Sequence, residues 1–159
     1  MVWEGLRNVH EPWWRHRRGQ PVIEYASRLL LVTFLPLAVW LFFWPDGNVM
    51  GHINATLFRW LHYYYVLPAS VNGYDTEQFF NFTAFGALAL LVRLAWEAPR
   101  SRELVIFGVT LALSIEVIQL YFITNRHFDW MDFIFTSLGC VAGVLAGHWI
   151  RAHLMRPNE

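Results

Sequence analysis

The stretch that decides the fold is LVIFGVTLALSIEVIQLYFI, residues 104–123. It is 20 residues long and holds one charged side chain, Glu116. A helix of about 20 residues crosses a hydrocarbon core of roughly 30 Å, so this stretch is expected to span a membrane. The whole chain shares its character. Of the 159 residues, 56% are apolar and only 15% are charged, whereas soluble domains carry about 25% charged residues.

Three further apolar runs approach the length of a span, at about residues 26–45, 79–96 and 131–150. Polar and charged segments separate the four runs. The sequence therefore predicts an all-α fold, in which residues 26–150 form a bundle of four transmembrane helices. A basic and aromatic tail, residues 1–25, precedes this membrane domain, and a short tail, residues 151–159, follows it.

The arginines predict the orientation of the bundle. All twelve positively charged residues are arginines. Ten of them lie in the N-terminal tail together with Arg28, in residues 93–102, or in the C-terminal tail, and the two opposite loops hold only Arg59 and Arg126. Loops rich in arginine stay on the cytoplasmic side. We therefore expect both termini, and the connection between the second and third spans, to be cytoplasmic.

Residues 49–67, between the first two spans, have a helical pattern of their own. Apolar side chains recur every three or four residues, at Met50, Ile53, Leu57, Trp60, Leu61 and Tyr64. Polar side chains occupy much of the other face. This pattern predicts an amphipathic helix that lies on the outer leaflet or packs across the mouth of the bundle.

Glu116 is the clearest candidate for a functional residue, because a carboxylate inside a span is costly unless it faces the bundle or is protonated. Gln119 lies three residues further on, on the same helix face, and can donate a hydrogen bond to it. Two interpretations stay open. The pair either holds helices together as an interhelical hydrogen bond or forms part of a functional polar site.

A second polar cluster, Arg126, Asp129 and Asp132, falls where the third span passes into the fourth. Asp129 is also a good N-cap for the fourth helix, and Asp132 suits its first turn, because the helix dipole favours negative charge there. Alternatively, Asp132 joins Glu116 in one acidic pocket. Two carboxylates and an arginine are suited to binding a cationic or polar headgroup.

The order and depth of these residues resemble the VanZ-like family of small bacterial membrane proteins. The resemblance covers about residues 75–150 and rests on the series Asp75, 79–86, Glu116, Gln119, Arg126, Asp132, Gly139 and Gly143. Two positions depart from the family pattern. Asn81 stands where the family often has histidine, and Thr136 stands where it usually has asparagine. Neither residue is a strong base, which weakens any proposal of proton transfer there.

The resemblance implies a multi-pass protein of the bacterial cytoplasmic (inner) membrane, in a family named for low-level resistance to teicoplanin. The residues expected to line a binding pocket at the outer mouth are Asp75, Asn81, Glu116, Gln119, Arg126, Asp129 and Asp132.

Gly139, Gly143 and Gly147 recur every four residues and are expected to let another helix approach closely, either within the bundle or in a partner subunit. His148, near the end of the fourth span, could ligate a haem or chlorin, but a lone histidine there is more often a polar interface residue. The single cysteine, Cys140, excludes an intrachain disulfide. No pattern predicts a metal or another cofactor, and the net charge of zero gives no indication of nucleic acid.

Two kinds of function remain. The first is a VanZ-like protein that contacts membrane lipids and binds a lipid-linked or cell-envelope component at its outer mouth. The second is a non-catalytic accessory subunit of a larger respiratory or photosynthetic membrane complex, which would contact other subunits through the stripe of Gly139, Gly143 and Gly147 and through aromatic surfaces. The sequence offers no nucleophile paired with a base, and Glu116 and Asp132 are the one pair left that could serve as acid and base. We therefore expect binding rather than catalysis.

Overall fold

The structure is a computed structural model that describes residues 20–45, 47–64, 72–97, 99–124 and 127–154. Within these ranges the chain is helical and has no strand. The five helices, in chain order, are α1 (Gln20–Phe42), α2 (Gly47–Tyr63), α3 (Gly73–Ala95), α4 (Ser101–Phe122) and α5 (Trp130–Leu154). The all-α fold predicted from the sequence is confirmed.

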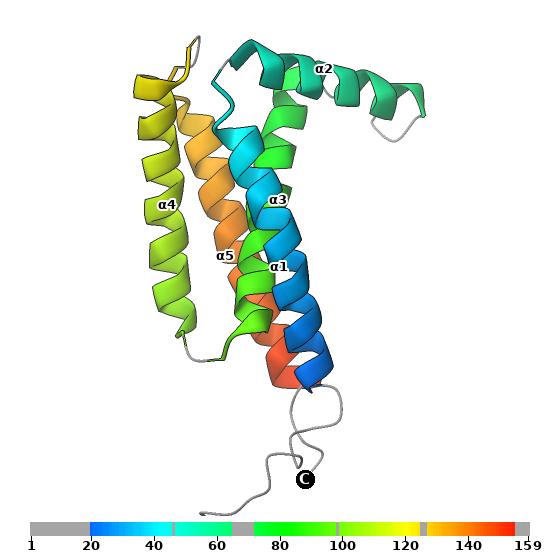
Figure 1. Ribbon diagram of the computed structural model, residues 1–159, viewed down its shortest axis with the longest axis vertical. Coiled ribbons are helices and arrows are strands. Elements are labelled where there is room, and N and C mark those ends of the chain that lie inside the picture. The colour runs from blue at the N-terminus through cyan, green and yellow to red at the C-terminus, as the bar shows by residue number, and fades with distance from the viewer. Residues whose placement is uncertain (1–19, 46, 65–71, 98, 125–126, 155–159) are drawn as a thin grey trace, which may run out of the picture.

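Four of these helices are long and apolar enough to cross a membrane. Their candidate spans have mean hydropathies between 1.4 and 2.0 and cover Val22–Trp40, Gly73–Ala95, Ser101–Phe122 and Trp130–His153. They run side by side in Figure 1, with α1 and α3 on one side and α4 on the other. Many of their large apolar side chains are exposed, as expected where lipid replaces water as the surroundings. The chain is a multi-pass membrane protein.

The second span begins earlier than the hydropathy indicated, at Gly73 rather than at residue 79. Asn72 is its N-cap. The Asn72 Oδ1 atom accepts a hydrogen bond from the Asp75 backbone N–H at 3.0 Å, and the Asp75 carboxylate accepts one from the Asn72 N–H at 3.2 Å. This reciprocal capping box satisfies amides that the first helical turn leaves without partners. Because the residues of this first turn are polar, a search of the sequence for apolar runs does not detect it.

The helices α3 and α5 form the central pair, and the glycines of α5 explain their close packing. A Cβ atom added at Gly139 or Gly143 would collide with the backbone carbonyl of Phe82 or Gly86 in α3. One added at Gly147 would lie 2.8 Å from the Cβ atom of Arg93. The sequence left open whether these glycines pack within the bundle or against a partner subunit. In the structure they pack against α3 of the same chain.

One end of the bundle holds the start of α1, the connection between α3 and α4, and the end of α5 (Figure 1). We call it the arginine-rich end. There the Arg151 guanidinium donates to the Leu94 carbonyl at 2.8 Å and contacts the Glu24 carboxylate at 3.0 Å. The Arg28 guanidinium donates to the Ala95 carbonyl at 3.0 and 3.1 Å. These arginines satisfy carbonyls that the last turn of α3 leaves without partners.

The helix α2 lies across the opposite end of the bundle, which we call the pocket end (Figure 1). It occupies Gly47–Tyr63, which overlaps most of the predicted range of 49–67. Ile53 and Leu57 line a cavity at this end of the bundle, while the rings of Trp60 and Tyr64 are exposed and lie 4.7 Å apart. The helix is thus found packed across the mouth, and its contact with the outer leaflet stays a prediction.

Candidate functional site

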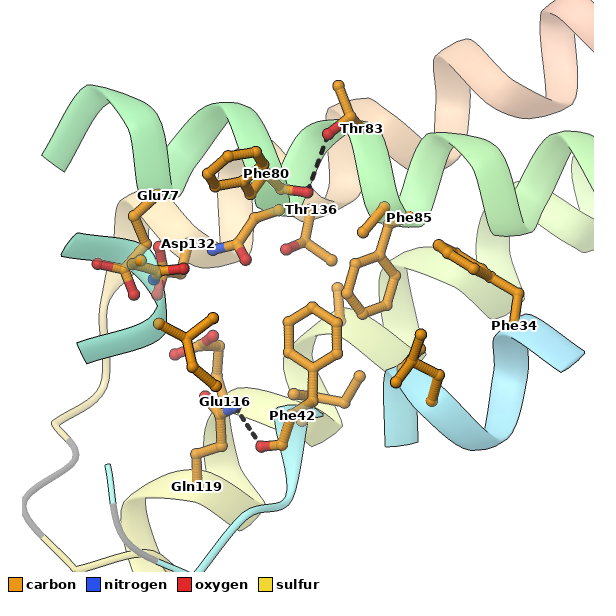
Figure 2. Close-up of a pocket in the computed structure, with 18 of the residues that line it drawn as sticks. Phe34, Phe42, Glu77, Phe80, Thr83, Phe85, Glu116, Gln119, Asp132 and Thr136 are labelled. Carbon is orange, nitrogen blue, oxygen red and sulfur yellow. Dashed lines mark hydrogen bonds between the residues drawn. The ribbon is translucent and has the colours of Figure 1, made fainter. Parts of the chain in front are cut away.

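A cavity of about 390 Å³ opens at the pocket end, within the size range of roughly 300–1,000 Å³ that is usual for ligand sites. All five helices contribute to its walls. Figure 2 shows that the lining side chains surround an open centre, with carboxylates gathered at one end and the rings of Phe34, Phe42 and Phe85 at the other. We call it the carboxylate pocket, after Glu77, Glu116 and Asp132, which all line it.

The polar end of the pocket draws its side chains from three helices. α3 supplies Glu77 and Asn81, α4 supplies Glu116 and Gln119, and α5 supplies Asp132 and Thr136. Glu116 and Asp132 are each only 5% exposed. Because Glu116 and Gln119 are separated by three residues, both project from the same face of α4 into the pocket. The structure thus brings together the intramembrane carboxylates that the sequence singled out.

Glu116 also fixes the backbone that leads into α5. Its Oε2 atom accepts a hydrogen bond from the Asp129 backbone N–H at 3.2 Å. Gln119 also has an acceptor that the sequence did not suggest, since its Nε2 atom donates to the Phe42 carbonyl at 2.9 Å. Phe42 is the last residue of α1, so its carbonyl accepts no backbone hydrogen bond within that helix. The two residues therefore connect α4 to different parts of the chain.

Asp132 is held by a residue that the sequence analysis missed. The Gln78 Nε2 atom donates to the Asp132 Oδ1 atom at 2.9 Å, and the bond is buried. Gln78 precedes the apolar run 79–96, and it was overlooked because the helix was expected to begin at residue 79. Glu77 was overlooked for the same reason. The signal that identifies both is the N-cap motif of Asn72 and Asp75, which places them in the second turn of α3.

Asp129 takes the capping role rather than a place in the pocket wall. It directly precedes α5, and its Oδ1 atom accepts a hydrogen bond from the Met131 backbone N–H at 2.7 Å. The Tyr74 hydroxyl donates to the same carboxylate at 3.3 and 3.4 Å. Asp129 is therefore the N-cap of α5 and also ties α5 to the first turn of α3.

Asp75 lies outside the carboxylate pocket as well. It borders another cavity of about 510 Å³, which is lined by Tyr74, Asp75, Gln78, Phe79, Phe82, Met131 and Phe135. The structure thus separates Asp75 and Asp129 from Asn81, Glu116, Gln119 and Asp132, which line the pocket. Arg126, the remaining residue of the expected set, lies outside the described residues.

The apolar end of the pocket comes mainly from helices that the sequence did not connect with the site. Phe34, Leu37, Ala38 and Phe42 of α1 line it at helical spacing. Phe85 of α3 packs edge-on against Phe42, with ring centroids 5.0 Å apart. The helix α2 covers the mouth with Ile53, Asn54 and Leu57. The site is therefore amphiphilic, with carboxylates at one end and a hydrocarbon surface at the other.

The chemistry that this arrangement offers is acceptance of hydrogen bonds and of positive charge. Among the described residues, no group of three or more histidine, cysteine, aspartate or glutamate side chains is placed to hold a metal ion. His148 lies far from the pocket, towards the arginine-rich end, where its Nδ1 atom is 3.5 Å from the Ser101 hydroxyl. Carboxylates, amides and a hydroxyl around one cavity suit a ligand rich in hydroxyl or amino groups.

A protein-family model matches most of the chain. The VanZ/LLP1 family model matches residues 22–151, which takes in α1, the segment that holds α2, and all the pocket residues. No curated protein and no solved structure matches the chain. Because this match covers most of the 159 residues, the chain belongs to the VanZ/LLP1 family and is a VanZ-like membrane protein with four candidate spans.

Proposed function

We propose that this protein binds the polar headgroup of a lipid-linked or other cell-envelope component in the carboxylate pocket, without converting it to a product. The single observation that carries the proposal is the position of Glu77, Glu116 and Asp132, which line one end of a ligand-sized cavity inside a membrane domain. Carboxylates at membrane depth are costly and are usually functional. On this proposal the pocket end faces the outside of a bacterial cytoplasmic membrane.

The chemistry of the walls indicates the class of headgroup. Glu77, Glu116 and Asp132 accept hydrogen bonds when ionised, and Asn81 and Thr136 can either accept or donate. A headgroup that carries several hydroxyl groups or an amino group complements such walls. Arg126 stays in the proposal as a contact for an anionic part of the same headgroup, because it follows α4 closely in the sequence.

Binding is preferred to catalysis because of the residues that face the pocket. Its described lining holds no serine, cysteine or histidine, so a serine or cysteine nucleophile paired with a histidine base is not formed there. Thr136 and Asn81 are not strong bases either. We therefore expect the purified protein to show no turnover of lipid-linked cell-wall precursors.

The test is retention of a native ligand. The protein is purified from native membranes in a mild detergent, and native mass spectrometry records the molecules that stay bound. We expect a bound envelope amphiphile in the unaltered protein and its loss from the double variant Glu116→Gln/Asp132→Asn. Glu97→Gln is the matched control, because this carboxylate is exposed at the arginine-rich end. Equal retention by all three proteins would remove the proposal.

The same preparation addresses the alternative role as an accessory subunit of a larger membrane complex. Protein partners would be found by mass spectrometry of the co-purified chains. Such partners would need a surface other than Gly139, Gly143 and Gly147, because these glycines pack against α3. A stable complex that forms equally well with the double variant, with no small ligand bound in either, would favour the accessory role.

A further inference from the structure

The carboxylate pocket continues into an apolar arm, which Figure 2 shows as the end occupied by phenyl rings. We define the arm by Phe34, Leu37 and Ala38 of α1, Phe85 of α3, and Ala112 and Ile115 of α4. It contains no polar side chain of its own. Two of its six residues are alanines, one from α1 and one from α4, so the side chains at these positions are small.

The arm lies between two helices that have little contact with each other. α1 packs on α3, and α4 packs on α5, while no extensive packing joins α1 to α4 in the described part of the chain. The two meet near the pocket end, where the Gln119 side chain donates to the Phe42 carbonyl at 2.9 Å. The Thr124 backbone N–H also donates to the Pro45 carbonyl there, at 3.3 Å. Deeper in the membrane domain, the arm occupies the space between α1 and α4.

Leu37 lies at the boundary between the arm and the surroundings of the bundle. It lines the pocket and is nevertheless 49% exposed. It also lies within the candidate span Val22–Trp40, where the surroundings are hydrocarbon rather than water. An apolar space at this depth is filled more favourably by a lipid chain than by water, which would find no hydrogen-bonding partners there.

We propose that the apolar arm holds one hydrocarbon chain, which enters from the bilayer between α1 and α4 while the headgroup occupies the carboxylate end. This inference rests on the proposed function and identifies the ligand as an amphiphile held at both ends. A water-soluble headgroup would leave the arm without an occupant. A lipid already in the bilayer can insert its chain between α1 and α4. Its headgroup then reaches the carboxylate end without passing α2, which covers the mouth of the pocket.

The experiment uses the purified full chain in vesicles of phosphatidylethanolamine and phosphatidylglycerol that contain a small fraction of phosphatidylethanolamine with a diazirine in one acyl chain. After illumination, mass spectrometry locates the labelled residues. We expect labels at Ala38 and Ile115, which face the arm, in addition to Val39 and Leu113, which are exposed on the outside of the same two helices. Labels on the outer residues alone would overturn the inference.

A variant that fills the arm sharpens the result. Ala112→Trp places a large ring among the arm residues, and we expect labelling at Ala38 and Ile115 to be lost while labelling at Val39 persists. The matched control is Ala146→Trp, at an exposed position of α5, which should leave the pattern unchanged. If Ala112→Trp does not fold, the comparison of inner and outer residues in the unaltered protein still decides the question.

The outcomes separate this inference from the proposed function. If native mass spectrometry finds a ligand that depends on Glu116 and Asp132 but the arm is not labelled, the chain-binding inference fails and headgroup binding stands. A retained ligand that is water-soluble would likewise contradict the chain-binding inference and leave headgroup binding standing. If the arm is labelled and no ligand depends on the carboxylates, the headgroup proposal fails, and the combined amphiphile proposal fails with it.

Discussion

The side-chain amide of Gln78 donates to the carboxylate of Asp132 at 2.9 Å, and both residues are at least 95% buried. The bond joins α3 to α5 beside the carboxylate pocket, at the level where Asp132 forms part of the wall. It therefore holds one of the three pocket carboxylates in position. The close packing of α3 and α5 along the glycines brings the two side chains within reach of each other.

We predict that Gln78 and Asp132 are energetically coupled. Gln78→Leu removes a buried donor to a carboxylate and should lower the free energy of unfolding by about 1–3 kcal/mol. In the double variant Gln78→Leu/Asp132→Leu, the loss should be smaller than the sum of the single losses, with a coupling energy of about 0.6–1.7 kcal/mol for a bond between membrane helices. Unfolding in mixed detergent micelles measures all three variants. Additive losses would show that the bond contributes no energy.

The glycines of α5 lead to a second prediction, about packing. Gly143→Ala places a methyl group against the Gly86 carbonyl, so α3 and α5 must move apart. Overpacking of this kind costs about 1–3 kcal/mol, and we expect a lower thermal midpoint in detergent. The matched control is Gly51→Ala in α2, where nothing lies within 4 Å of the added atom. That control should be neutral or stabilising, by up to about 1 kcal/mol, because alanine favours the helix.

The orientation of the bundle is the subject of a third prediction. The arginine-rich end holds the connection at Ser101 and the end of α5, whereas Asn72 lies at the pocket end. In a Cys140→Ala background, a membrane-impermeant thiol reagent applied from outside intact cells should label Asn72→Cys and leave Ser101→Cys unlabelled. Labelling of both sites after the cells are opened is the control. The reverse pattern in intact cells would invert the assignment of the two ends.

Much of the fold was predictable because hydropathy acts locally along the chain. A run such as 104–123 must be buried in lipid whatever its neighbours are, since about 20 apolar residues match the hydrocarbon thickness. All four spans were found in this way. The error at the start of α3 has an equally local cause. Its first turns are built from Asn72, Asp75, Glu77 and Gln78, which hydropathy assigns to a loop and which capping makes helical.

The site was predictable only in part. Glu116 and Asp132 were identified because carboxylates in or beside an apolar run are costly, and this cost can be read from one segment alone. The sequence left open whether Asp129 belonged with them or capped α5, and the structure shows it capping α5. The lining contributed by α1 was not predicted, because an apolar side chain that faces a cavity and one that faces lipid look the same in a sequence. For α2, packing across the mouth was one of two alternatives that the sequence left open.

The sequence by itself thus determined the number of spans and two of the three pocket carboxylates, Glu116 and Asp132, because each follows from the local cost of placing a residue type in hydrocarbon. It also carried the family resemblance, which rests on the order of residues along the chain. Only the tertiary structure decided which residues share one cavity. Glu77, Glu116 and Asp132 come from three helices, and their meeting depends on how closely α5 approaches α3 and on where α1 leaves α4 unpacked. Those distances are set by packing between helices that are far apart in the chain, and no single segment contains that information.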